Sequence, residues 1–210
     1  MSDDMENTKK DMTNMMTQKT YISKRKFGAY VLFSCVMFLF FIVTGYWTAQ
    51  ADPTAGDQVY TMFQEMVVAG VISESAVIMA LQIFINNVQI CALIFLGGAT
   101  FGLLTVFLLM TNGIVIGVLI EVLLRDMSKT ALMIGLLPHG IFEIPAVLVS
   151  AALGMIVARG LFEEFAGRGN ALNSARAAGW LFVTYVVPFI FIAACVEAFI
   201  TPFVMGMMQI

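Results

Sequence analysis

One histidine and one carboxylate stand in a segment that is otherwise apolar. His139 and Glu143 are four residues apart, framed by Pro138 and Pro145, and His139 is the only histidine of the chain. On an α-helix, residues at i and i+4 share a face, so the two side chains can hydrogen-bond or bind a common group. An imidazole beside a carboxylate in such a segment suits three roles: an internal structural pair, a proton or ion pathway, and a metal site.

A metal site would need further ligands from distant parts of the chain. The set that the sequence offers is His139, Glu143 and Glu197, with Glu121 as another source. The spacing is His-x-x-x-Glu and not His-Glu-x-x-His, so the helical metalloprotease motif is absent from the sequence. Glu121 has a simpler interpretation, because Arg125 follows at i+4 and the two can form an ion pair at a helix end. No other cofactor is predicted.

The composition identifies the surroundings of these groups. Of the 210 residues, 60% are hydrophobic and 12% are charged, with 18 Phe and 16 Met. A soluble domain carries about 25% charged residues, and a water-soluble core of this size cannot hide so many apolar side chains. We therefore expect an integral membrane protein with the lipid bilayer as its main partner. The net charge of −3 gives no footprint for nucleic acid.

The first part of the chain divides into a tail, a span and a polar segment. Residues 1–26 carry six of the eleven basic residues and are expected to form a flexible cytoplasmic tail. Residues 27–47 lack charges and can cross a bilayer, although Ala49-Gln50-Ala51 also resembles a signal-peptide cleavage site. Residues 48–87 are expected to be extracytoplasmic, with interfacial amphipathic helices.

The remaining residues, 88–210, are expected to form the helical core in the membrane. We place one span at about 88–110 and a shorter one at 113–124, because Asn112-Gly113 is a turn dipeptide. The alternative break is at Gly97-Gly98. The three cysteines lie in apolar stretches and are expected to be small packing residues.

Prolines and charged residues mark the boundaries of the elements in the last third of the chain. A helix is expected to start at Pro138, with 131–137 as an interrupted or re-entrant approach. A hydrophilic loop at 159–176 precedes the last span. This loop and the tail carry nine of the eleven basic residues, which places both in the cytoplasm. The sequence thus predicts an all-α, multi-pass protein of the plasma membrane, with its N-terminus cytoplasmic, about five transmembrane helices, and interruptions near Asn112 and Pro138.

Polar and small residues within these spans should face the interior of the bundle. Glycine pairs at i and i+4 allow close backbone packing, either within one chain or at a homodimer seam. The expected packing glycines are Gly98, Gly102, Gly113 and Gly117. The expected buried polar cluster consists of Asn86, Asn87, Asn112, His139, Glu143 and Glu197.

The order of these features resembles the stage II sporulation protein M family over about residues 80–205. The block from Leu137 to Pro145, which reads LPHGIFEIP, is its most specific part. It is joined by Phe84-Ile85-Asn86-Asn87, by Thr111-Asn112-Gly113 with Gly117, and by the segment from Glu197 to Pro202. The resemblance implies that Asn112, His139, Glu143 and Glu197 matter as a polar core.

The resemblance also implies a role. In endospore formers the family's namesake belongs to a membrane complex with two partner proteins that remodel peptidoglycan, and it has no catalysis of its own there. The family also occurs in organisms that do not sporulate, so the resemblance supports a membrane scaffold better than it supports sporulation.

Three functions fit these features. The favoured one is a non-enzymatic scaffold or complex subunit, a homo-oligomer or a member of a membrane protein complex. In it, His139 and Glu143 pair internally and no open cavity reaches them. The second is a small transporter or channel, working as a homodimer through broken helices around Asn112 and Pro138. The third is an intramembrane metal-dependent hydrolase that uses His139, Glu143 and Glu197.

Overall fold

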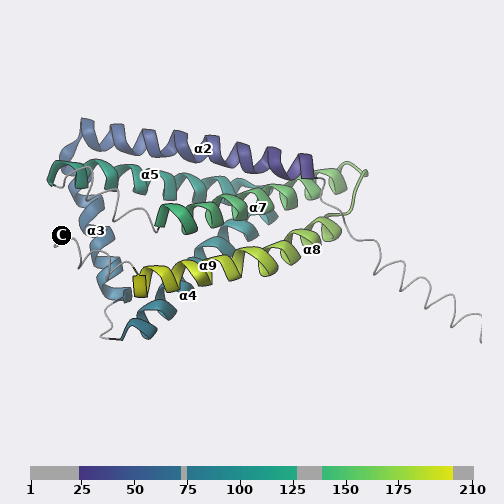
Figure 1. The fold of residues 1–210 in the computed structure, drawn as a ribbon. Coiled ribbons are helices and arrows are strands. Elements are labelled where there is room, and N and C mark those ends of the chain that lie inside the picture. Colours follow the sequence, from purple (N-terminus) through teal and green to yellow (C-terminus); the bar gives the residue numbers. More distant parts are fainter. Residues whose placement is uncertain (1–23, 72–74, 127–138, 201–210) are drawn as a thin grey trace, which may run out of the picture.

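The computed structural model describes residues 24–71, 75–126 and 139–200 of the chain, and these residues are almost entirely helical (Figure 1). In chain order, the helices are α2 (Lys24–Ala51), α3 (Pro53–Val71), α4 (Ala76–Leu96), η1 (Gly97–Thr100), α5 (Leu103–Asp126), η2 (His139–Glu143), α7 (Ile144–Phe165), α8 (Ala171–Leu181), η3 (Phe182–Val186), α9 (Val187–Cys195) and η4 (Val196–Ile200).

Five helical segments in the described residues are long and apolar enough to cross a membrane. They are Lys24–Ala51, Ala76–Thr100, Leu103–Arg125, Ile141–Phe165 and Ala171–Ile200. Within a bilayer each backbone N–H and C=O must be satisfied inside the protein, and a helix does this within one segment. The predicted fold class, an all-α bundle of about five membrane-length helices, is confirmed.

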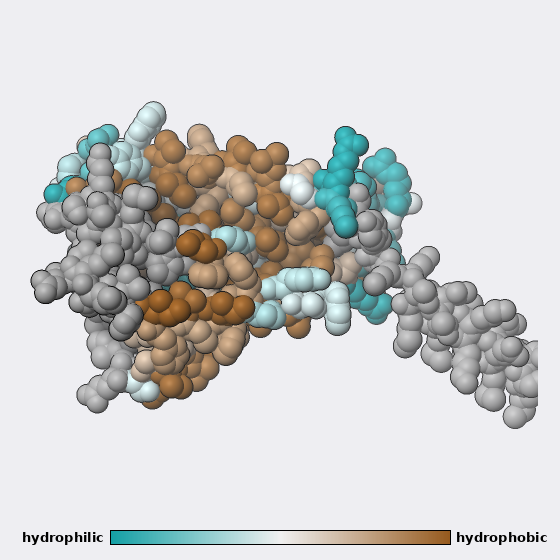
Figure 2. All heavy atoms as spheres, viewed as in Figure 1, coloured by the Kyte–Doolittle hydropathy of each residue, from teal (hydrophilic) through white to brown (hydrophobic). Residues whose placement is uncertain are grey.

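The outer surface of the bundle is apolar where a bilayer would cover it. Figure 2 shows a hydrophobic band between two ends that carry hydrophilic residues. Many large apolar side chains of the described residues are exposed, among them Leu103, which is 76% exposed, and Leu39, which is 61% exposed. A soluble monomer rarely exposes so large an apolar surface, so this band is the lipid-facing surface.

The first and third spans lie side by side and run in the same direction. Phe38 of α2 packs against Gly113 of α5, and Ala49 near the end of α2 lies beside Arg125 near the end of α5. α3 turns away at this end and lies across the bundle (Figure 1). α7 ends at the opposite end of the molecule, where α2 begins.

The break in the long apolar run lies at residues 97–102 and not at Asn112. The chain turns through η1, with Phe101 at φ 55° and Gly102 at φ 85°, and α5 is then continuous through Asn112. The predicted interruption near Asn112 is therefore wrong, and the alternative break at Gly97-Gly98 is correct. The Asn112 side chain finds a hydrogen-bond partner within its own helix, because its Nδ2 donates to the Leu108 carbonyl at 2.8 Å.

This break also moves the boundary of the second span. Residues 76–87 were expected to be an interfacial piece, but they form the first half of α4, a helix of membrane length. Near the other end of the chain, α7 extends to Phe165 and α8 begins at Ala171, so the expected loop at 159–176 is shorter than predicted. The predicted helix start at Pro138, with its approach at 131–137, lies outside the described residues.

Widened turns accompany the prolines. The π-turns η2, η3 and η4 each end two residues before a proline: Pro145, Pro188 and Pro202. A proline inside a helix lacks an N–H and its ring clashes with the carbonyl four residues earlier. A π-turn bonds five residues ahead and relieves this conflict at the cost of a bulge in the helix. The last span, α8 to η4, accordingly continues as one helix through Pro188.

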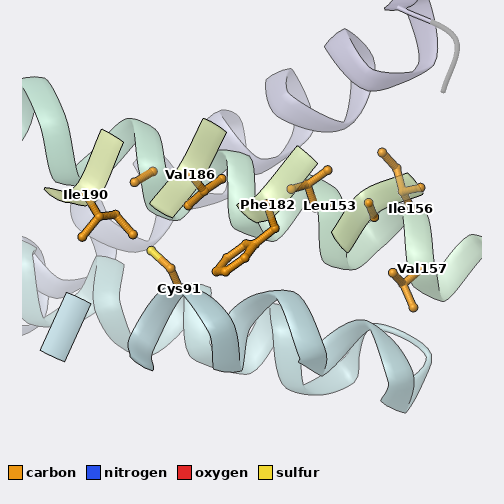
Figure 3. Packing of buried hydrophobic residues seen from close by; sticks show 9 residues of the cluster. Cys91, Leu153, Ile156, Val157, Phe182, Val186 and Ile190 are labelled. Carbon is orange, nitrogen blue, oxygen red and sulfur yellow. The ribbon is translucent and has the colours of Figure 1, made fainter. Parts of the chain in front are cut away.

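A hydrophobic core lies between α4, α7 and the last span. Figure 3 shows Leu153, Phe182, Val186 and Ile190 directed into it, with Cys91 facing them from α4. Phe182 also stacks on Phe95 with ring centroids 5.1 Å apart. This core holds the second, fourth and fifth spans together.

The glycines bring helix backbones into direct contact. An added Cβ at Gly117 would overlap the carbonyl oxygen of Ile42, and one at Gly113 would lie 2.8 Å from the Cβ of Phe41. Gly45 of α2 lies in the same way against the backbone of Ile114, so α2 and α5 interlock from both sides.

A second set of glycines joins α4, η1 and α7. Gly98 lies against the carbonyl of Gly154, and Gly102 contacts the side chain of Ala158. Beside them the buried Thr105 hydroxyl donates to the Ile94 carbonyl at 2.8 Å. Gly98, Gly102, Gly113 and Gly117 thus all contact neighbouring elements of the same chain.

Candidate functional site

A cavity of about 260 Å³ lies in the half of the bundle that carries α3. Its walls come from all five spans and from α3, which contributes Phe63. Five of the residues that line it are amides or acids: Asn86, Asn87, Asn112, Glu143 and Glu197. The cavity is therefore the place where polar side chains from distant segments face a common space.

Each polar residue reaches the cavity from a different position in the fold. Asn86 and Asn87 lie in the first half of α4, and Asn112 lies in the middle of α5. Glu143 is the last residue of η2, two residues before Pro145, and Glu197 lies in η4. The two widened turns thus carry the two carboxylates.

Burial differs among these residues. Glu143 is 7% exposed, whereas Asn87, Asn112 and Glu197 are half-buried. The cavity is not fully enclosed, and the exposed residue Asn86 lies in its wall. The expectation that no open cavity reaches Glu143 is therefore wrong.

The predicted partner of Glu143 is only partly described. The backbone of His139 begins η2, and its side chain lies outside the described residues. The pairing of His139 with Glu143 therefore stays a prediction. Among the described residues, no group of three His, Cys, Asp or Glu side chains is arranged to hold a metal ion.

The sequence interpretation missed Cys91 as a residue of the cavity wall. Cys91 is 2% exposed, lines the cavity and lies beside the Ser150 hydroxyl. Ser150 in turn donates to the Ala146 carbonyl at 2.7 Å. The signal in the sequence is the i, i+4 spacing from Asn87 to Cys91, which places both on one face of α4.

The cavity surface is chemically mixed. Carboxylate and amide oxygens accept hydrogen bonds, and the amide nitrogens donate them. Apolar side chains such as Phe38, Ile83 and Leu119 fill the rest of the wall. Such a site can hold water, a proton or a small polar or cationic solute, because acceptor oxygens dominate its polar side chains.

A second polar centre ties α3 to the bundle. Arg125 forms the predicted helix-end ion pair with Glu121, which is confirmed. The same guanidinium donates to Asp57 of α3 at 2.9 Å and to the Ala49 carbonyl at 3.3 Å. Asp57 was not foreseen as a partner, because 68 residues separate it from Arg125 in the sequence.

Comparisons with known proteins show the family to which the chain belongs. The profile of the family described as Stage II sporulation protein M matches residues 34–202, a range that contains every residue lining the cavity. An uncharacterized protein of Methanocaldococcus jannaschii is 35% identical over 123 residues, which are 57% of this chain and 69% of that protein. No solved structure gives a match. The chain belongs to the stage II sporulation protein M family.

Proposed function

We propose that the protein is a non-enzymatic scaffold of the membrane, a subunit that holds other proteins of a membrane complex in place. Two facts support this proposal: membership of the stage II sporulation protein M family, and a bundle in which helix backbones interlock. The single observation that carries it is the glycine packing that joins α2 to α5 and α4 to α7.

This packing favours a rigid body over a moving one. Transporters that alternate access rock one part of the bundle against another. Here Gly45 and Gly117 place α2 and α5 in backbone contact, and Gly98 does the same for the α4–η1 corner and α7. Helices in such contact cannot slide without opening a gap, which costs packing energy in lipid. A rigid bundle suits a platform for partners.

The polar residues around the cavity fit this proposal as an internal lock. They come from α4, α5, η2 and η4, so contacts across the cavity would fix these elements relative to one another. Under this proposal His139, Glu143, Asn112 and Glu197 act by holding the bundle and not by chemistry.

The size of the native assembly tests the scaffold proposal. We expect the protein in gently solubilised host membranes to migrate on a native gel as a larger species than the purified chain alone. The control is the purified chain in the same detergent. Equal migration of the two samples would contradict membership of a complex with other proteins.

We also propose the orientation that the basic residues predict. Lys26 at the start of α2 and Arg159 near the end of α7 lie at the same end of the bundle, and Arg168 follows in the adjacent loop. Basic residues concentrate on the cytoplasmic side of membrane proteins. This supports a cytoplasmic N-terminus in the plasma membrane, with α3 on the outer side.

The cavity supports a second candidate, a small transporter or channel. Asn112 and Glu143 line a space that is not fully enclosed, as a solute pathway would require. In a background without native cysteines, Asn112→Cys should react with a water-soluble thiol reagent if the cavity is a pathway. Leu109→Cys is the matched control, because Leu109 is fully buried in the same helix. Equal protection at both positions would remove this candidate.

A further inference from the structure

A second hollow lies on the outside of the bundle, at the end where α2 begins. It measures about 380 Å³ and is lined by Lys26, Ala29, Tyr30 and Phe33 of α2 and by Met155 and Arg159 of α7. On α2 these positions follow i, i+3, i+4 and i+7, which form one face of a helix. The hollow is therefore a groove between two adjacent spans.

The groove changes from polar to apolar along its length. Lys26, Tyr30 and Arg159 lie toward the polar end, and Phe33 and Met155 line its deeper part. Seven residues of α-helix separate Lys26 from Phe33, which is about 10 Å along the axis. Phe33 is 49% exposed in the apolar band that lipid covers. The groove thus crosses the boundary between headgroups and acyl chains.

The donors at the polar end are partly held in place. Arg159 Nε donates to Glu163 at 2.7 Å, and Arg159 Nη1 reaches the Tyr30 hydroxyl at 3.5 Å. A guanidinium has five N–H donors, so these two contacts leave others for a ligand. Lys26 is exposed beside it, and Lys24 and Arg25 are exposed at the same helix start.

The charge balance at this end is positive. Glu163 is the carboxylate that faces the two basic side chains of the groove, and Arg168 also lies within its electrostatic reach. One carboxylate against Lys26, Arg159 and Arg168 leaves a net positive charge. Guanidinium and ammonium groups together bind phosphate oxygens well.

We propose that this groove binds an anionic phospholipid, with its phosphate on Lys26 and Arg159 and its first acyl carbons along Phe33 and Met155. A basic pocket between spans on the cytoplasmic side is a known setting for anionic lipid headgroups. The apolar floor favours a lipid over a free anion, because a free anion would leave Phe33 and Met155 uncovered.

Native mass spectrometry of the full-length chain in detergent tests the proposal. We expect phosphatidylglycerol to bind more tightly than phosphatidylcholine. Lys26→Gln should weaken the binding of phosphatidylglycerol about fivefold, as expected for one basic residue near a headgroup. Arg176→Gln is the matched control, because Arg176 is exposed in α8 and does not line the groove; it should bind like the unmodified chain.

Glu163→Gln should change the affinity for phosphatidylglycerol in the opposite direction to Lys26→Gln. A misfolded variant would lose affinity and could not produce this result. Loss of the carboxylate that occupies Arg159 should tighten the binding of phosphatidylglycerol. Equal binding of phosphatidylcholine, equal weakening in Arg176→Gln, or no tightening in Glu163→Gln would overturn the proposal. Displacement of the lipid by inorganic phosphate alone would assign the groove to a free anion and would also overturn it.

Discussion

Gly117 of α5 packs against the backbone carbonyl of Ile42 in α2, leaving no room for a side chain at this position. The contact is reciprocated one turn away by Gly45 and Ile114. In lipid, where no hydrophobic effect drives helices together, such close approach supplies the van der Waals contacts that hold them. The interlock of α2 with α5 is therefore a main source of the rigidity that the scaffold proposal requires.

Gly117→Ala should destabilise the protein, because the new methyl group must push α2 and α5 apart. Overpacking of this kind costs about 1–3 kcal/mol. The measurement is the free energy of unfolding by SDS titration in mixed micelles. Gly28→Ala is the matched control, since Gly28 lies in α2 with no atom within 4 Å of an added Cβ. It should be neutral or slightly stabilising, as alanine is the better helix former. Similar losses in both variants would show that the contact is unimportant.

The glycines also show where the sequence was informative and where it was not. The sequence predicts features that depend on local composition or on fixed spacing. These are the membrane-length helices, the family motif and the glycine pairs. Asn112-Gly113 was misread as a turn. Gly113 packs closely against Phe38 and Phe41, and the Asn112 side chain donates a hydrogen bond to the Leu108 carbonyl of the same helix. One sequence cannot show whether an Asn-Gly pair in lipid makes a turn or a helix contact.

The candidate site was predictable only in part for a similar reason. Intramembrane amides and acids could be collected as a group, because their cost in lipid directs them inward. Glu143 and Glu197 lie in the π-turns that end two residues before Pro145 and Pro202, and these turns change the face of the helix on which each carboxylate lies. Such shifts of a helix face are not encoded in residue spacing. The link from Arg125 to Asp57 was missed because it joins elements that are far apart in the chain.

Arg125→Gln should release α3 from the end of the bundle. This substitution removes the ion pairs with both Glu121 and Asp57. We expect limited proteolysis to cleave within residues 53–71 several-fold faster than in the unmodified chain. Arg176→Gln removes a basic residue from α8 and should leave the cleavage pattern unchanged. An unchanged pattern in Arg125→Gln would mean that apolar contacts alone hold α3.

Glu143→Leu should lower stability by about 1–3 kcal/mol, because it removes a buried hydrogen-bonding group from the cavity wall. Glu143→Gln keeps hydrogen-bonding capacity and should lose less. Both variants are compared by SDS unfolding with Glu65→Gln, which changes an exposed carboxylate of α3. If the cluster is a lock, a double-mutant cycle with Asn112→Leu should show a coupling of about 0.6 kcal/mol or more. Additive effects would mean that the two side chains act separately.

The proposed orientation predicts which ends of the bundle face outward. In intact cells and a background without native cysteines, Thr54→Cys at the start of α3 should react with a membrane-impermeant thiol reagent. Leu172→Cys in α8 should react only after the cells are opened. Both residues are exposed, so a difference in labelling reports the side of the membrane and not burial. The reverse labelling pattern would invert the topology.

The most direct test of the scaffold proposal is a pulsed electron spin resonance distance between α2 and α9. Spin labels at Leu39→Cys and Ile192→Cys, both exposed on the lipid-facing surface, report on the bundle without entering its core. The measurement uses the protein in lipid nanodiscs after replacement of Cys35, Cys91 and Cys195. A rigid scaffold predicts one narrow distance distribution that stays the same at acidic and neutral pH. Two distributions that exchange population between these conditions would contradict the scaffold and favour a moving transporter.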